Sequence, residues 1–183
     1  DMKLMLHTKS NVYITELNKI TFGECEDILD AIDIDSMEFK NSDELEKCIK
    51  STLKDRISKI HPVITSIFCI PDEDFASIKI DELVEILTFI TSYALNELSQ
   101  CASNSEEKKG GNIASLYQIL FDLQITLCDK FKGLNPFILR HETMQEVFLL
   151  IKRLNNAQKE SNEPINQSNG DVIRRPASDD SWF

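Results

Sequence analysis

The chain has 183 residues and a formal net charge of −11; 42% of its residues are hydrophobic and 28% are charged. This composition predicts one soluble domain, or one domain with an appendage, because the apolar fraction is large enough for a core. The acidic balance argues against nucleic acid and membranes as partners, since phosphate groups and anionic lipids attract clusters of Lys and Arg. No apolar run approaches the roughly 20 residues of a membrane-spanning helix. The expected location is the cytoplasm, that of the host if the protein is viral, or a virion.

The first twenty residues differ from the rest and are expected to form a short hairpin or an extended arm. Apolar residues at 4–6 and 12–15 flank a polar stretch between them. The first helix is expected to begin at Thr21, because Thr21 and Glu24 have the spacing of a capping box. Its buried face is expected to comprise Phe22, Cys25, Ile28, Leu29 and Ile32.

A second helix is predicted from Ser42, after an acidic connection at residues 33–41. Acidic residues directly after Ser42 place negative charge near the positive end of the helix dipole. Pro62 is expected to interrupt this helix, because proline disfavours helical conformation in the residue before it. Residues 63–68 are then expected to form a short segment that is almost wholly buried, and residues 72–74 a loop.

Three further helices are predicted from apolar residues at helical spacing. They cover residues 81–99, 113–131 and 141–156. Gly133 is expected to cap the second of these, and Pro136 to prevent its continuation. The polar residues 103–112 form the clearest internal loop and a candidate site of proteolysis.

Antiparallel packing of these helices predicts an all-α fold, a compact bundle of about five helices. The apolar pattern stops near Leu154, and polar residues dominate from Gln158 onward. Such a segment does not bury enough apolar area to offset its ordering entropy. We therefore expect an extended arm or hairpin over residues 1–20, a helical domain over residues 21–157 and a flexible polar tail over residues 158–183.

No group of residues has the spacing of a known catalytic or metal site. The histidines His7, His61 and His141 fall in separate segments, without the positioned partner that acid–base catalysis requires. The acidic residues 30–38 lack the glycine and the length of an EF-hand calcium loop. We expect no catalytic residue, no metal and no cofactor.

The cysteines are odd in number, widely spaced and mostly set in apolar helical patterns. Buried, reduced thiols are the prediction, with disulfides or metal ligation as the alternatives. The residues are Cys25, Cys48, Cys69, Cys101 and Cys128.

The polar tail ends in an aromatic pair, Trp182 and Phe183, preceded by Asp179 and Asp180. Aromatic anchors contribute strongly to binding at interfaces, so a docking motif for another protein is one interpretation. The alternatives are that the tail folds back onto its own domain or has no contact. The expected partner-binding residues are Trp182, Phe183, Asp179, Asp180, Arg174 and Arg175.

The stretch Tyr-Ile-Thr-Glu-Leu at 13–17, then Ile-Thr-Phe-Gly-Glu at 20–24 leading into Asp27 and Ile28, resembles the opening of tail-assembly chaperones of long-tailed bacteriophages. The helical residues 135–154, followed by a polar extension, are similar to the layout of that family. The resemblance implies a non-enzymatic helical domain that binds the tape-measure protein and keeps its apolar helices from aggregating. It also implies that the tail, residues 158–183, contacts the tail-tube protein.

Three functions follow as hypotheses. The leading one is a phage tail-assembly chaperone that covers apolar surfaces of the tape-measure and tail-tube proteins. The second is a structural or adaptor subunit of a virion or other assembly, with its tail docked on a neighbouring subunit. The third is an enzyme with a carboxylate site around Glu24 and Asp27. The sequence leaves open whether the chain forms a homo-oligomer.

Overall fold

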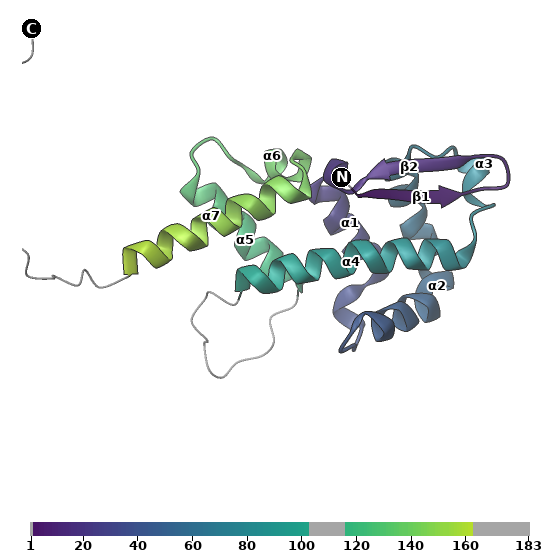
Figure 1. Ribbon diagram of the computed structural model, residues 1–183, viewed down its shortest axis with the longest axis horizontal. Helices are drawn as coiled ribbons and strands as arrows, with labels where there is room; N and C mark the ends of the chain where they lie inside the picture. The colour runs from purple at the N-terminus through teal and green to yellow at the C-terminus, as the bar shows by residue number, and fades with distance from the viewer. Residues whose placement is uncertain (1, 103–115, 163–183) are drawn as a thin grey trace, which may run out of the picture.

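The structure of the protein is a computed structural model that describes residues 2–102 and 116–162. Within these residues, helices lie alongside one another and a two-stranded sheet covers one end of them (Figure 1). In chain order the elements are β1 Lys3–His7, β2 Val12–Glu16, η1 Leu17–Lys19, α1 Phe22–Ile32, η2 Ile34–Ser36, α2 Ser42–Phe68, α3 Asp72–Phe75, α4 Ile80–Ala102, α5 Leu116–Lys130, α6 Pro136–His141 and α7 Met144–Asn162. The predicted all-α fold, with about five substantial helices and a short extended N-terminal segment, is confirmed.

β1 and β2 form a hairpin, the first of the two alternatives for the N-terminal segment. They pair antiparallel in a register that places Met5 opposite Ile14. Leu4 and Leu6 are buried against the helices, because successive side chains of a strand point to opposite faces. Met5, Val12 and Ile14 are therefore left on the outer face of the hairpin, each just over half exposed.

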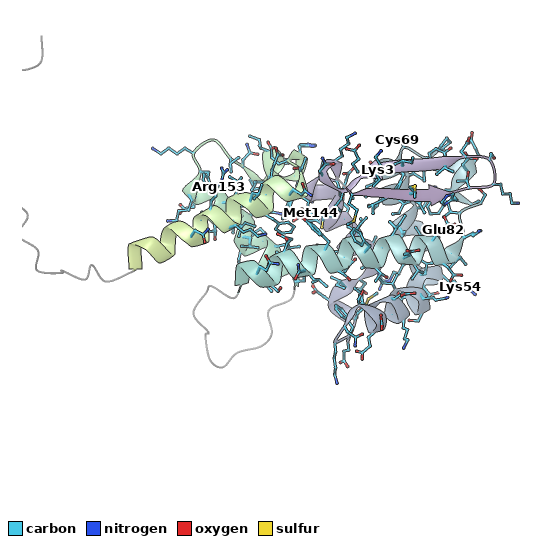
Figure 2. All side chains as sticks on the ribbon, in the orientation of Figure 1. Lys3, Lys54, Cys69, Glu82, Met144 and Arg153 are labelled. Atoms are coloured by element: carbon cyan, nitrogen blue, oxygen red, sulfur yellow. The ribbon has the colours of Figure 1, made fainter. Side chains whose placement is uncertain are left out.

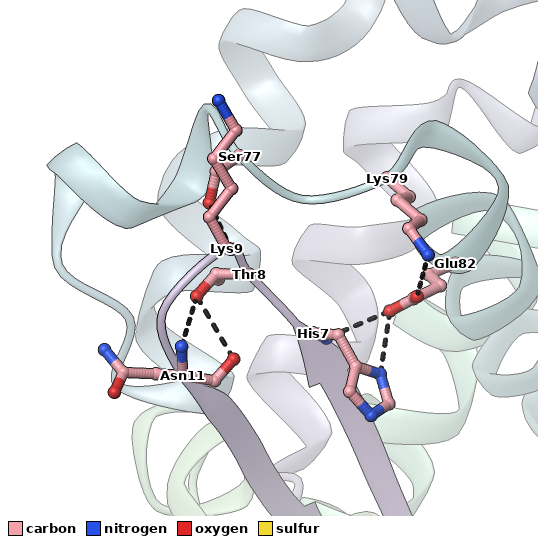
Figure 3. A network of polar contacts seen from close by, with 7 residues as sticks. All are labelled: His7, Thr8, Lys9, Asn11, Ser77, Lys79 and Glu82. Carbon is pink, nitrogen blue, oxygen red and sulfur yellow. Dashed lines mark hydrogen bonds and ion pairs between the residues drawn. The ribbon is translucent and has the colours of Figure 1, made fainter.

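Polar contacts attach the turn of the hairpin to the segment before α4 and to its first turn (Figure 3). The backbone N–H and the ring Nδ1 of His7 lie 2.9 and 3.1 Å from the same carboxylate oxygen of Glu82. The N–H of Lys9 donates to the hydroxyl of Ser77 at 3.1 Å. The hydrogen bond from the N–H of His7 is the main reason why the pKa of Glu82 lies below its usual value.

α1 is the central helix and packs against α2, α4, α6 and α7. It begins with the predicted capping box: the N–H of Glu24 donates to the Thr21 hydroxyl, and the N–H of Thr21 donates to the Glu24 carboxylate. The first residue of α1, Phe22, is 1% exposed. Its ring meets that of Phe148 in α7 edge to face, with 6.3 Å between the centroids. The predicted buried face of this helix is confirmed, because all five of its residues are buried.

The start of α7 is joined to the chain around the beginning of α1. The N–H of Met144 donates to the carbonyl of Ile20 at 2.9 Å, and the N–H of Phe22 donates to the carbonyl of Glu142 at 2.8 Å. Met144 is fully buried and lies in the middle of the molecule (Figure 2). These bonds connect the N-terminal part of the protein directly to its last described helix.

α2 contradicts the prediction that Pro62 interrupts the second helix. The helix continues through Pro62 to Phe68. Beyond the proline, Ile64, Ile67 and Phe68 recur at helical spacing and are buried. Burial of this apolar face stabilises the last turns of the helix, and that outweighs the local preference of proline.

Two predictions near the end of α2 also need correction. Residues 63–68 are not almost wholly buried, because only three of these six residues are buried. Residues 72–74 belong to the short helix α3 and not to a loop. Between these segments α2 ends at Phe68, and the next residue, Cys69, has a left-handed φ of 53° that turns the chain out of the helix.

Replacing Pro62 by Ala is expected to raise the free energy of unfolding by about 1 kcal/mol, because alanine restores an N–H and removes a ring clash inside a helix. In a regular helix the restored N–H would donate to the carbonyl of Ser58, four residues earlier, and Pro62 itself is exposed. Urea unfolding followed by circular dichroism measures the change. Pro71→Ala is the control, since Pro71 lies outside a helix at the N-cap of α3. A Pro62→Ala protein less stable than the parent would contradict this account.

The C-terminal helices depart from their predicted bounds. Gly133, with a φ of 98°, lies in the turn after α5, and Pro136 does not merely stop that helix but opens α6 as its first residue. The helix predicted at residues 141–156 is present as α7, which begins at Met144, and the short helix α6 before it was not predicted. α7 then extends to Asn162.

Candidate functional site

The partner-binding residues predicted from the sequence lie outside the described residues, and their role stays a prediction. They are Trp182, Phe183, Asp179, Asp180, Arg174 and Arg175.

Each of the three histidines has its own local surroundings. His7 in β1 contacts Glu82, as described above, and His61 in α2 lies with its Nε2 3.3 Å from the Asp72 carboxylate. His141 is the last residue of α6 and is exposed. In the described ranges, no three or more His, Cys, Asp or Glu residues are placed to hold a metal ion.

Three carboxylates of α1, those of Glu24, Glu26 and Asp27, have structural roles. Glu24 forms the capping box, and the Arg140 guanidinium of α6 donates to Glu26 at 2.8 Å and to Asp27 at 2.7 Å. The side-chain amide of Gln124 in α5 also donates to Glu26. This network holds α5 and α6 against α1. The carboxylate pair considered for an enzyme, Glu24 and Asp27, is thus engaged with a helix N-terminus and an arginine.

Burial raises the pKa of Glu26 above its ordinary value of 4.5, and the neighbouring Arg140 lowers it in part. A carboxyl group whose folded pKa exceeds its unfolded pKa stabilises the fold at low pH. That contribution is lost as the pH rises through the folded pKa. The network therefore favours the folded state less at neutral pH than below the unfolded pKa of this carboxyl.

Arg140→Ala is expected to raise the pKa of Glu26 further, because it removes the positive charge while the carboxyl stays buried. Carboxyl-carbon NMR titration measures this pKa directly. Stability should also fall more steeply than in the parent protein as the pH rises above about 4.5. Arg153→Ala, which removes an exposed arginine of α7, is the control and should leave Glu26 unchanged. A lowered or constant pKa in Arg140→Ala would contradict the assignment.

The prediction of buried, unpaired cysteines is confirmed only in part. All four cysteines whose side chains are described are free, and Cys25 is buried, which raises its pKa to about 12. The other three are not buried: Cys48 and Cys128 are half-buried and Cys69 is exposed.

An open groove of about 800 Å³ lies between the connection from α1 to α2, the C-terminal half of α4 and the start of α5. Charged groups are also at its edge: Asp35, Glu38, Lys40 and Glu44. The apolar walls of this groove are formed by Ile34, Met37, Phe39, Leu95, Leu116 and Ile119.

Residues 33–41 were predicted to be an acidic connection only, and nothing in that prediction indicated the groove. Met37 and Phe39 were the signal that was available, because two large apolar side chains in a short polar connection need a packing partner or a ligand. Both side chains are only partly buried. Their contribution to the groove depends on α4 and α5, which are distant in sequence.

Other large apolar side chains are exposed elsewhere on the surface. They comprise the outer face of the hairpin, Phe121 and Ile125 one turn apart on α5, Phe137 of α6, which is 80% exposed, and Leu149 of α7. Within the described ranges no helix combines the length and the apolar character needed to cross a membrane. Comparison with protein-family models, curated proteins and solved structures gives no match.

Proposed function

We propose that this protein is a non-enzymatic tail-assembly chaperone of a long-tailed bacteriophage. In this proposal the helical body binds the tape-measure protein, and residues 158–183 bind the tail-tube protein. The resemblance of residues 13–28 to that family supports the proposal. The observation on the structure that carries it is the groove, because an open apolar surface on a folded domain suits the covering of an apolar client.

The test compares the full chain with a truncated chain that ends at Asn162. This end point is preferable to one near Asn156, because α7 continues to Asn162 and a shorter chain loses its last turns. Each form is co-expressed with the tape-measure protein or with the tail-tube protein of the same phage. The full chain should keep the tape-measure protein in the soluble fraction and co-purify with both partners.

The truncated chain should retain the tape-measure protein and lose the tail-tube protein. Retention of both partners would remove the docking role of the tail. Failure of the full chain to bind the tape-measure protein would overturn the proposal.

A structural or adaptor subunit of an assembly is the second candidate. The outer face of the hairpin favours it, because Met5, Val12 and Ile14 form an exposed apolar face that a permanent neighbour would cover. Mass spectrometry of finished particles separates the two candidates. A chaperone should be absent from the particles, whereas a structural subunit should be present in a fixed ratio to the other proteins.

A further inference from the structure

The groove has a wall that is held in place by hydrogen bonds before any partner arrives. The N–H of Leu116 at the start of α5 donates to the Asp35 carboxylate at 2.7 Å. The N–H of Lys40 donates to the Glu44 carboxylate at 2.8 Å, which fixes the end of the connection against α2. A wall that is ordered in advance lowers the entropy that a binding partner must lose on association.

The charge around the groove favours a cationic partner. Three carboxylates, those of Asp35, Glu38 and Glu44, stand at the edge against one amine, that of Lys40. The chain as a whole carries a formal charge of −11. Positive side chains beside an apolar partner surface would be attracted to this rim, and the attraction would speed association and select against acidic partners.

The lining of the groove selects a helix over an extended segment. Its lining residues come from the connection between α1 and α2, the first turn of α2, α4 and α5, so no strand edge is among them. An extended partner would therefore bring unpaired backbone N–H and C=O groups against apolar walls. A helix satisfies these groups internally and presents apolar side chains one turn apart to a hydrophobic groove.

We propose that the groove binds an amphipathic helix of another protein, one whose apolar face is bordered by Lys or Arg. This deepens the proposed function and rests on it for the view that the groove is where the client is bound. It adds the class of partner, a basic amphipathic helix, and the residues that select it.

The test uses the full chain and a designed helical peptide of about 20 residues, a length at which an isolated helix is reasonably stable in water. The peptide carries Leu at helical spacing on one face, Lys on both borders of that face and Ala elsewhere. One comparison peptide has Glu in place of every Lys, and another has the same composition in scrambled order. Fluorescence anisotropy should show binding of the Lys peptide alone, with an affinity that falls as salt is added.

Two substitutions in the protein locate the binding. Phe39→Ser removes an apolar contact of the groove and should weaken binding of the Lys peptide about thirtyfold, as expected for an aromatic anchor. Glu38→Lys reverses one charge at the exposed rim. It should weaken binding of the Lys peptide about fivefold and strengthen binding of the Glu peptide. The controls are Phe137→Ser, which makes the same change, and Asp55→Lys, which makes an equivalent charge reversal; both positions are exposed and do not line the groove. Glu38→Lys decides the result if Phe39→Ser fails to fold.

Equal binding of the Lys and Glu peptides, or equal effects of groove and control substitutions, would overturn the inference. Sedimentation that shows a dimer dissociated by Glu38→Lys would overturn it too, by assigning the groove to a second copy of this chain. The two proposals fail separately. If the tape-measure protein binds equally well to the parent protein and to the groove variants, only the inference about the groove is rejected. If the Lys peptide binds in the groove but the tape-measure protein does not bind at all, only the proposed chaperone function is rejected.

Discussion

Phe148→Ala should lower the free energy of unfolding by about 4 kcal/mol, which is typical for the loss of a buried phenylalanine ring. Phe148 is 2% exposed and packs edge to face on the ring of Phe22. Removing it leaves a cavity between α7 and the central helix α1 and also removes the aromatic pair contact. Urea unfolding followed by circular dichroism provides the measurement.

The next residue of α7 supplies the matched control. Leu149 is 53% exposed, so Leu149→Ala should change the free energy of unfolding by no more than about 0.5 kcal/mol. The difference between neighbouring positions tests the orientation of α7 as well as the burial. Similar losses in the two variants would mean that α7 is rotated relative to the arrangement described above.

Gly23→Ala should lower the free energy of unfolding by about 2–3 kcal/mol, because a Cβ at this position overpacks the contact between α1 and α6. The added atom would lie 2.8 Å from the carbonyl oxygen of Arg140 and 3.1 Å from the Cβ of that residue. A backbone oxygen does not move out of the way as a side-chain end does, so the two helices must separate. Thermal and urea unfolding both report the loss.

The sign of this change is informative, because at an exposed helix position alanine is more favourable than glycine by about 1 kcal/mol. Asp30→Ala, at an exposed position of the same helix, is the control and should have little effect. A more stable Gly23→Ala protein would show that α1 and α6 are not in close contact at this point.

The sequence predicted those parts of the fold that depend on local patterns. Thr21 and Glu24 have the spacing of a capping box, and the structure has both of its hydrogen bonds. The apolar periodicity likewise located the five substantial helices. The prediction that Pro62 interrupts the second helix was wrong. Whether a proline breaks a helix depends on what the following turn packs against, and the local sequence does not contain that information.

The groove depends even more on distant parts of the chain. Met37 and Phe39 become part of a groove because Leu95 of α4 and Leu116 of α5 also line it. Periodicity shows which face of a helix is apolar, but not which faces remain uncovered after packing. The network of Arg140 with Glu26 and Asp27 was missed for the same reason, since more than a hundred residues separate Arg140 from the two carboxylates.

The central place of α1 has a consequence for how the chain folds during synthesis. Phe22 leaves the ribosome early, but Phe148, which covers it, is made only after α2, α4 and α5. Long-range contacts of this kind slow folding and leave apolar surface uncovered in partly made chains. The nascent polypeptide would thus reach its stable core only when translation has passed α7, and premature termination before that helix should yield an aggregation-prone product.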